Sequence, residues 1–99
     1  MALEMRVVAV TDVSGGISEA GGLECLVKAE RVHRQLRPQL PTDYLSRMKV
    51  VFANGARMAV VVDGAEVVGV ALWRLVENTY EGRRLYVDDL VSDETHRSQ

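Results

Sequence analysis

The sequence predicts an α+β fold in the order strand, helix, helix, strand, strand, strand, with a mainly antiparallel sheet. Three observations lead to this fold class. Two apolar stripes with helical spacing lie between residues 18 and 54, and a short run of β-branched residues precedes them. After Arg57 the apolar residues become continuous or recur with a period of two. Asp63-Gly64 between two β-branched runs indicates a hairpin with a type I′ turn, so the second and third strands are expected to be antiparallel neighbours.

The first strand is expected at Met5–Thr11, because this run is short, rich in β-branched residues and followed by a glycine-rich loop. Residues 18–36 then predict a helix with one apolar stripe facing a core. The stripe consists of Leu23, Leu26, Val27, Glu30, Val32 and Leu36. A basic cluster near the end of this helix favours a solvated face, where cations suit the helix dipole; it contains Arg31, His33, Arg34 and Arg37.

Pro38 and Pro41 end the first helix, because each proline removes a backbone donor and restricts the residue before it. Thr42 is the expected N-cap of a second helix that closes at Asn54-Gly55. Its predicted core face holds Leu45, Met48, Val51 and Phe52. The remaining strands are expected at 58–62, 66–76 and 83–92, and their runs lack polar alternation, so helices are expected to cover both faces of the sheet.

Composition places the chain among globular proteins, since 47% of its 99 residues are hydrophobic and 26% are charged. Residues 1–99 are expected to form one domain. A formal net charge of −2 gives no overall attraction to nucleic acid or to an anionic membrane. No apolar run is long enough to span a membrane, no secretory signal precedes the first strand, and a cytoplasmic location is expected.

A metal site is not expected from the sequence. His33, His96 and Cys25 have neither the spacing of a zinc motif nor a fourth ligand. Cys25 is the single cysteine, so it cannot form an internal disulfide, and it is expected to be a small buried residue.

The end of the chain carries a resemblance to a known family. The run Tyr86-Val87-Asp88-Asp89-Leu90-Val91, followed by Arg97-Ser98-Gln99, resembles the fourth strand and the start of the coenzyme A loop of the GNAT acetyltransferase superfamily. In that family the loop reads Arg-x-x-Gly-x-Gly/Ala, and its backbone amides hold the pyrophosphate of acetyl-CoA. The sequence stops where the first glycine should stand. The resemblance therefore implies a partial domain, the N-terminal half of a GNAT fold, with the C-terminal half absent.

The resemblance also implies a reaction and its residues. The enzyme would transfer an acetyl group from acetyl-CoA to an amine of a small molecule or protein. Leu90, Val91 and Ser92 would lie along the pantetheine arm, and Arg97, Ser98 and Gln99 would begin the pyrophosphate loop. Ser92 departs from the valine that is usual in the family. Tyr44, in the linker that borders the acceptor site in the family, and Tyr86 would contact the substrate.

Asp88 and Asp89 are the candidate catalytic carboxylates. A period of two sends them to opposite faces of the strand, so one of them would bind or deprotonate the amine, through water, and the other would not. The alternative is that both cap the strand or pair with Arg83 or Arg84. Both interpretations stay open at the level of the sequence.

Binding of acetyl-CoA by the 99 residues alone is expected to be weak or absent, because the pyrophosphate loop and the helix dipole behind it are missing, and this truncated portion is expected to be inactive alone. A second hypothesis is a stand-alone half-domain that acts as a protein-binding or dimerisation module. Its fourth strand would be an exposed edge with Leu85, Val87, Leu90 and Val91, and homodimerisation through this edge is expected. A third is an α+β domain unrelated to acyl transfer.

Overall fold

A four-stranded antiparallel sheet forms the centre of the fold, and its strands lie side by side in chain order. The computed structural model describes residues 3–8 and 22–97, and side chains as far as residue 95. The strands are β1 (Leu3–Val8), β2 (Ala56–Asp63), β3 (Glu66–Asn78) and β4 (Gly82–Ser92). The expected antiparallel pairing of the second and third strands is confirmed. Strand β1 lies two residues earlier than expected, and residues 9–11 of the expected strand fall outside the described residues.

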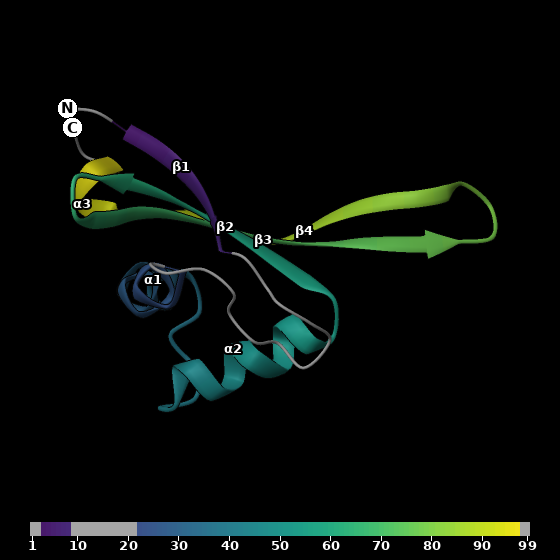
Figure 1. The fold of residues 1–99 in the computed structure, drawn as a ribbon, viewed down its shortest axis with the longest axis horizontal. Coiled ribbons are helices and arrows are strands. Elements are labelled where there is room, and N and C mark those ends of the chain that lie inside the picture. The colour runs from purple at the N-terminus through teal and green to yellow at the C-terminus, as the bar shows by residue number, and fades with distance from the viewer. Residues whose placement is uncertain (1–2, 9–21, 98–99) are drawn as a thin grey trace.

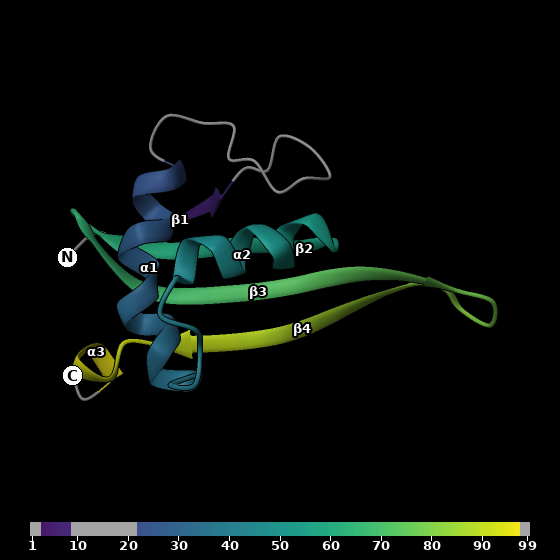
Figure 2. The same cartoon turned by 90° about the horizontal axis from the view of Figure 1, so that it is seen from below.

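Helices α1 (Gly22–Leu36) and α2 (Tyr44–Ala53) both pack on one face of the sheet (Figures 1 and 2). The expected order of strand, two helices and three strands is therefore confirmed. A short third helix, α3 (Glu94–Arg97), follows β4 and was not expected. The expectation that helices cover both faces is wrong for the described residues, because none of them places a helix across the second face.

The buried face of α1 is rotated from the expected stripe. Leu23 and Val27 are each about half exposed, whereas Leu26, Ala29 and Val32 are fully buried. The predicted solvated basic face is also wrong at one position, because His33 is only 1% exposed. The histidine takes an inward position because its ring finds polar partners inside the protein, described below.

The N-cap of helix α2 is Asp43 rather than the expected Thr42. The Asp43 carboxylate accepts from the backbone N–H of Ser46 at 3.1 Å and from its hydroxyl at 2.7 Å, which satisfies a donor of the first turn. The core face of α2 is confirmed in outline. Its buried residues are Tyr44, Met48 and Phe52, and Leu45 and Val51 pack partly buried beside them.

The β2–β3 hairpin is present, but its turn is not type I′. Asp63 pairs with Glu66, so Gly64 and Ala65 are the central residues of the turn. Gly64 has φ +62°, and Ala65 does not have a positive φ. A positive φ at the first central position alone is the pattern of a type II′ turn, which also matches the twist of the flanking strands.

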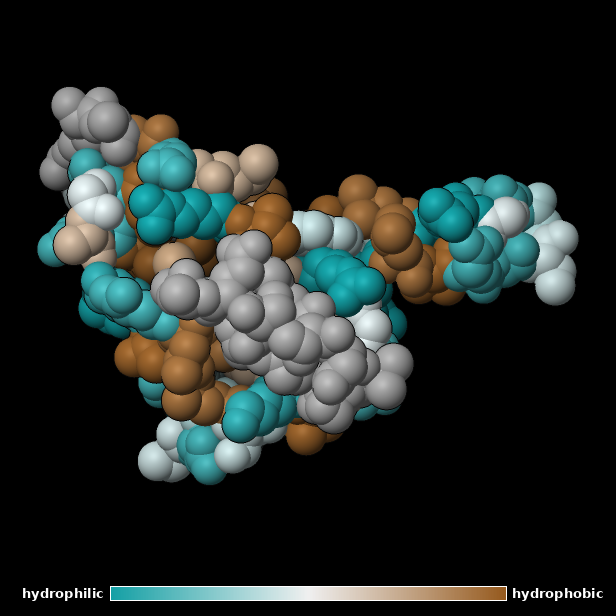
Figure 3. All heavy atoms as spheres, in the orientation of Figure 1, coloured by the Kyte–Doolittle hydropathy of each residue, from teal (hydrophilic) through white to brown (hydrophobic). Residues whose placement is uncertain are grey.

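Strands β3 and β4 extend beyond the other two as a two-stranded arm, and the molecule measures 44 × 28 × 26 Å (Figure 1). Leu75 pairs with Leu85 and Glu77 pairs with Arg83 along the arm. Leu75, Leu85 and Val87 are each more than half exposed. Hydrophobic atoms therefore cover part of the arm's surface between the body and a polar tip (Figure 3). None of the helices in the described ranges is long and apolar enough to cross a membrane.

Candidate functional site

The end of β4 lies at an edge of the sheet, because β4 is the last strand in the order and pairs only with β3 among the described strands. Leu90 and Ser92 are exposed, and Leu90 keeps 73% of its surface accessible. Val91 between them is partly buried and packs against the core. The three residues expected along the pantetheine arm therefore belong to a strand with one free side, where backbone groups are open to an extended ligand.

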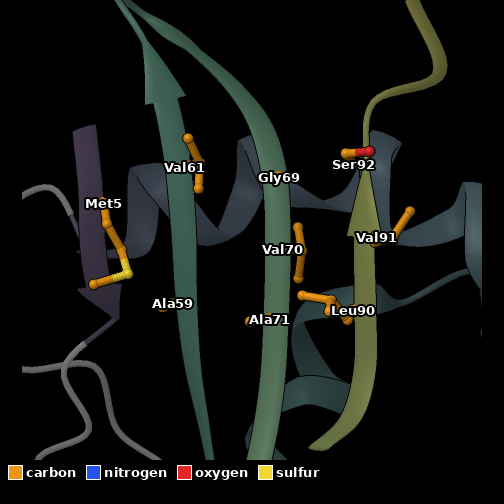
Figure 4. A pocket seen from close by; sticks show the side chains of 9 residues that line it. All are labelled: Met5, Ala59, Val61, Gly69, Val70, Ala71, Leu90, Val91 and Ser92. Atoms are coloured by element: carbon orange, nitrogen blue, oxygen red, sulfur yellow. The ribbon is translucent and has the colours of Figure 1, made fainter. Parts of the chain in front are cut away.

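An apolar hollow of about 500 Å³ lies beside this strand end, on the face of the sheet opposite α1 and α2 (Figure 4). Gly69 deepens it, since a Cβ built at this position would lie only 3.3 Å from the Cβ of Val61. The lining residues come from all four strands and are Met5, Ala59, Val61, Gly69, Val70, Ala71, Leu90, Val91 and Ser92. Ser92 supplies the polar side chain of this lining.

Asp89 points toward the helices and is 7% exposed. One carboxylate oxygen lies 2.7 Å from Nε2 of His33, and the other accepts from Nε of Arg37 at 2.9 Å. Nδ1 of His33 lies 2.8 Å from the hydroxyl of Tyr44. This buried chain of contacts joins β4, the end of α1 and the start of α2.

The protonation state of this chain follows from its partners. Burial raises the pKa of Asp89, but hydrogen bonds from His33 and Arg37 outweigh it and hold the pKa below its ordinary value. Burial raises the pKa of Tyr44, so its hydroxyl keeps its proton and can donate to Nδ1 of His33. With the Tyr44 hydroxyl as donor to Nδ1 of His33, the Nε2–H of His33 donates to Asp89, and each polar side-chain group in the chain has a partner. Asp89 is thereby fully engaged and shielded from solvent.

Asp88 is the extra residue of a β-bulge, because Leu72 pairs with Asp89 while Trp73 pairs with Val87. Both oxygens of Asp88 accept from Arg74, at 2.8 and 2.9 Å. Alternation along β3 puts Arg74 on the same face as the buried Leu72, so the ion pair places Asp88 on the helix side, together with Asp89. The expected separation onto opposite faces is therefore wrong, because the bulge interrupts the period of two.

The two aspartates differ in access. The Asp88 side chain keeps 31% of its surface exposed, so solvent or an amine can reach it. Both aspartates form ion pairs, as the alternative interpretation expected, but with Arg74 and Arg37 rather than with Arg83 or Arg84. Arg83 contacts Glu77 at 3.0 Å, and Arg84 contacts Glu81 at 2.6 Å.

Asp93 follows β4 directly and is 1% exposed. Its carboxylate accepts from Nη2 of Arg31 at 2.6 Å and from the amide of Gln35 at 3.2 Å. It also accepts from the backbone N–H of Thr95 at 3.2 Å, which caps the short α3. The Arg31 guanidinium is the main reason that the pKa of Asp93 lies well below its ordinary value.

The two candidate substrate tyrosines lie in different surroundings. Tyr44 is 2% exposed and its hydroxyl is engaged by His33, so it presents no surface to an acceptor in this structure. Tyr86 is 41% exposed, and its ring lies between the guanidinium groups of Arg74 and Arg84, at 5.8 and 5.5 Å. Contact with an acceptor stays a prediction for both, and the burial of Tyr44 speaks against it there.

The expected start of the pyrophosphate loop lies at the limit of the described chain. Arg97 is the last residue of α3, and its side chain is not described. Ser98 and Gln99 lie outside the described residues. Their assignment to coenzyme A stays a prediction. In the part of the chain that is described, no three acidic, histidine or cysteine side chains gather as a metal site.

Sequence reasoning missed the partners on α1. Arg31 and Gln35 bind Asp93, and His33 and Arg37 bind Asp89. The available signal was the spacing of four in each pair, which places both members on one side of a helix. The sequence does not show which acids lie opposite these helical residues, so the basic cluster was predicted to lie on a solvated face.

Comparison with known proteins identifies the fold. No protein-family model matches the sequence, and no curated protein matches it as a relative. Among solved structures, an acetyltransferase from Trypanosoma brucei matches with a TM-score of 0.61 at 18% identity, over 98% of this chain and 64% of that one. A ribosomal-protein-alanine N-acetyltransferase from Brucella melitensis matches with a TM-score of 0.66 at 12% identity, over 99% and 62%.

A predicted acetyltransferase with acetyl-CoA from Clostridium acetobutylicum matches with a TM-score of 0.56 at 14% identity, over 99% of this chain and 64% of that one. The chain thus spans somewhat under two thirds of the length of the structures it matches. These identities show the fold alone, and that fold is shared with part of these acetyltransferase structures.

Proposed function

We propose that this chain is part of a GNAT-type N-acetyltransferase, which transfers an acetyl group from acetyl-CoA to an amine of a small molecule or protein. The observation that carries the proposal is the end of β4, where Leu90, Val91 and Ser92 form an exposed strand edge within the fold of known acetyltransferases. A single cysteine and an acetyl-CoA cosubstrate fit a cytoplasmic location.

Each part of the β4 end has a role in this reaction. Backbone groups of Leu90, Val91 and Ser92 would hold the pantetheine arm, and a backbone N–H at this edge would donate to the thioester oxygen as negative charge develops there. Acetyl-CoA would supply the activated acetyl group: the amide C–N bond forms as the thioester C–S bond breaks, and coenzyme A leaves as a thiolate that takes up the proton given up by the amine. Asp88 is the carboxylate that an amine can approach, so it takes the amine's proton through water. Asp89 attaches β4 to α1 through its contacts with His33 and Arg37.

An acetyl-CoA titration followed by amide NMR tests the binding step. Weak binding is expected, with shifts concentrated at the amides of Leu90, Val91 and Ser92. S-acetylpantetheine should shift the same amides with similar affinity, since it carries the part of the ligand that these residues hold. Adenosine 3′,5′-bisphosphate, which lacks the thioester arm, should leave them unmoved. Shifts located elsewhere on the chain, or tight binding of acetyl-CoA by these 99 residues alone, would contradict the proposal.

The role of Asp88 is tested by replacing its carboxylate with the amide of asparagine. In an extended protein that also carries the C-terminal half of the fold, Asp88→Asn is expected to lower amine acetylation, measured as release of free thiol, by roughly a hundredfold, in line with the loss of a general base. Glu77→Gln is the matched control, because Glu77 also forms an exposed ion pair on the arm, with Arg83. An Asp88→Asn variant with unchanged turnover would remove Asp88 from the mechanism.

The second candidate function is a dimerisation module, favoured by the edge position of β4. The proposed partner is a second copy of the chain. Two identical strands that pair antiparallel about a twofold axis offer each other the same backbone groups, so the interface is self-complementary. The apolar side chains of Leu85, Val87 and Leu90 stand exposed along this strand and would be covered.

A further inference from the structure

Helix α1 holds the end of β4 by two separate sets of contacts. Arg31 and Gln35 bind the carboxylate of Asp93, at 2.6 and 3.2 Å. His33 and Arg37 bind the carboxylate of Asp89, at 2.7 and 2.9 Å. In each set the two helical residues lie four apart, and the two acids also lie four apart. The candidate thioester strand, Leu90 to Ser92, is the segment between the two held points.

The geometry makes these contacts a clamp on both ends of that segment. Asp89, Val91 and Asp93 alternate toward the helix side, with Val91 packed against the core between the two acids. On α1, Arg31 and His33 are two residues apart and therefore point about 200° apart around the helix axis. The two acids are thus held from different sides of the same helix, which resists both sliding and rotation of the strand.

The clamp also reaches the backbone itself. Nη2 of Arg37 donates to the carbonyl of Asp88 at 3.3 Å, and the side-chain oxygen of Gln35 accepts from the N–H of Glu94 at 2.9 Å. The N–H of Asp93 donates to the carbonyl of Val68 at 2.8 Å. Backbone groups on both sides of Leu90–Ser92 are therefore fixed by polar contacts.

We propose that Arg31, Gln35 and Arg37 are positioning residues that hold the thioester-binding backbone of β4 at a fixed distance and angle from α1. This inference rests on the proposed function. Side chains of an apolar core could stabilise the same contact without burying two carboxylates, whose desolvation is costly. Directional contacts add a fixed orientation of β4, which pairs on one side only among the described strands and would otherwise open locally.

Native-state hydrogen exchange of the whole 99-residue chain tests the clamp without requiring a ligand. Arg31→Met is expected to speed exchange of the Asp93 amide about tenfold and to leave the Val60 amide in β2 unchanged, since the opening is local. Arg31→Lys should restore most of the protection. Arg47→Met, an exposed arginine on α2, is the control and should change neither amide.

Two outcomes would overturn the proposal. Unchanged exchange at Asp93 in Arg31→Met would show that the contact holds nothing, and equal acceleration at Val60 would show that Arg31 supports the whole fold. An S-acetylpantetheine titration of wild type and Arg31→Met then separates the two ideas. Shifts of wild type away from Leu90–Ser92 defeat the proposed function, whereas equal affinity of the two proteins defeats the clamp alone.

Discussion

Burial gives the three aspartates at the end of β4 different chemical roles. Asp89 and Asp93 are nearly inaccessible, and each binds a cation and further donors on α1. Asp88 lies within reach of solvent and pairs with one arginine on the arm. Removing a partner from a buried carboxylate costs much more than breaking an exposed pair, so equal substitutions at these positions should have unequal effects.

Asp93→Asn is expected to lower the free energy of unfolding by about 2 kcal/mol at pH 7, as expected for a hydrogen-bonded charge. Arg31 depresses the pKa of Asp93 in the folded state, so this stabilisation is complete above the unfolded pKa of about 3.9 and is lost as the pH falls toward the folded value. Urea denaturation between pH 7 and pH 3 should show that the difference in free energy of unfolding between wild type and Asp93→Asn becomes smaller as the pH falls.

Asp88→Asn is the matched control for this measurement. Its exposed pair with Arg74 should contribute at most about 1 kcal/mol at pH 7. Equal losses for the two asparagine variants would contradict the assignment of Asp93 as the more strongly held acid.

Tyr44→Phe and Tyr86→Phe form a second matched pair. Loss of the Tyr44 hydroxyl leaves the buried Nδ1 of His33 without its donor, which is expected to cost about 1 to 3 kcal/mol. The Tyr86 hydroxyl accepts from Arg84 at the surface, so its removal should change stability by less than about 0.5 kcal/mol. Thermal unfolding of both variants measures the difference, and a larger effect at Tyr86 would refute the buried network.

At the scale of elements, strand order and helix boundaries were predictable because periodicity and turn residues act locally. The hairpin after β2 follows from Gly64, whichever turn type it adopts. The bulge at Asp88 was not predictable, since no glycine or proline marks it and it depends on pairing with β3. The prediction for the core face of α1 was wrong because it also depends on residues distant in the sequence. His33 can be buried because Asp89 and Tyr44 lie beside its ring.

The turn type is open to a direct test at this scale. Gly64→Ala is expected to destabilise the protein by about 1 to 2 kcal/mol, because a side chain disfavours the positive φ at this position. Ala65→Gly should cost no more than about 1 kcal/mol, through chain entropy alone. Chemical denaturation measures the free energy of unfolding of both variants, and Gly64→Ala should be the less stable. A type I′ turn would instead make Ala65→Gly stabilising.

At the scale of the whole molecule, hydrophobic surface is distributed unevenly. Helices α1 and α2 protect one face of the sheet, whereas the described residues leave the other face with a hollow, and β3 and β4 carry exposed leucines into the arm. Contiguous apolar surface of this kind marks a site of interaction. The candidate thioester edge and the proposed dimer edge are the same strand, so occupation by a partner copy and by a ligand should compete.

Association of the chain is expected to depend on this edge. Light scattering across a concentration series should show a dimer that Leu90→Lys weakens, because the new charge stands at an exposed position on β4. Val50→Lys, on the outer side of α2 and half exposed, should leave the dimer intact. A monodisperse monomer at every concentration would eliminate the strand-paired dimer.

The additional residue in β4 has a genetic consequence. A one-codon deletion at Asp88 would leave the other β4 residues in their present pairs with β3, because Leu72 already pairs with Asp89 and Trp73 with Val87. The remaining side chains would keep their faces of the sheet, and the deletion would remove the carboxylate that Arg74 holds. A protein shortened in this way should therefore keep its fold and lose the proposed general base in a single mutational step.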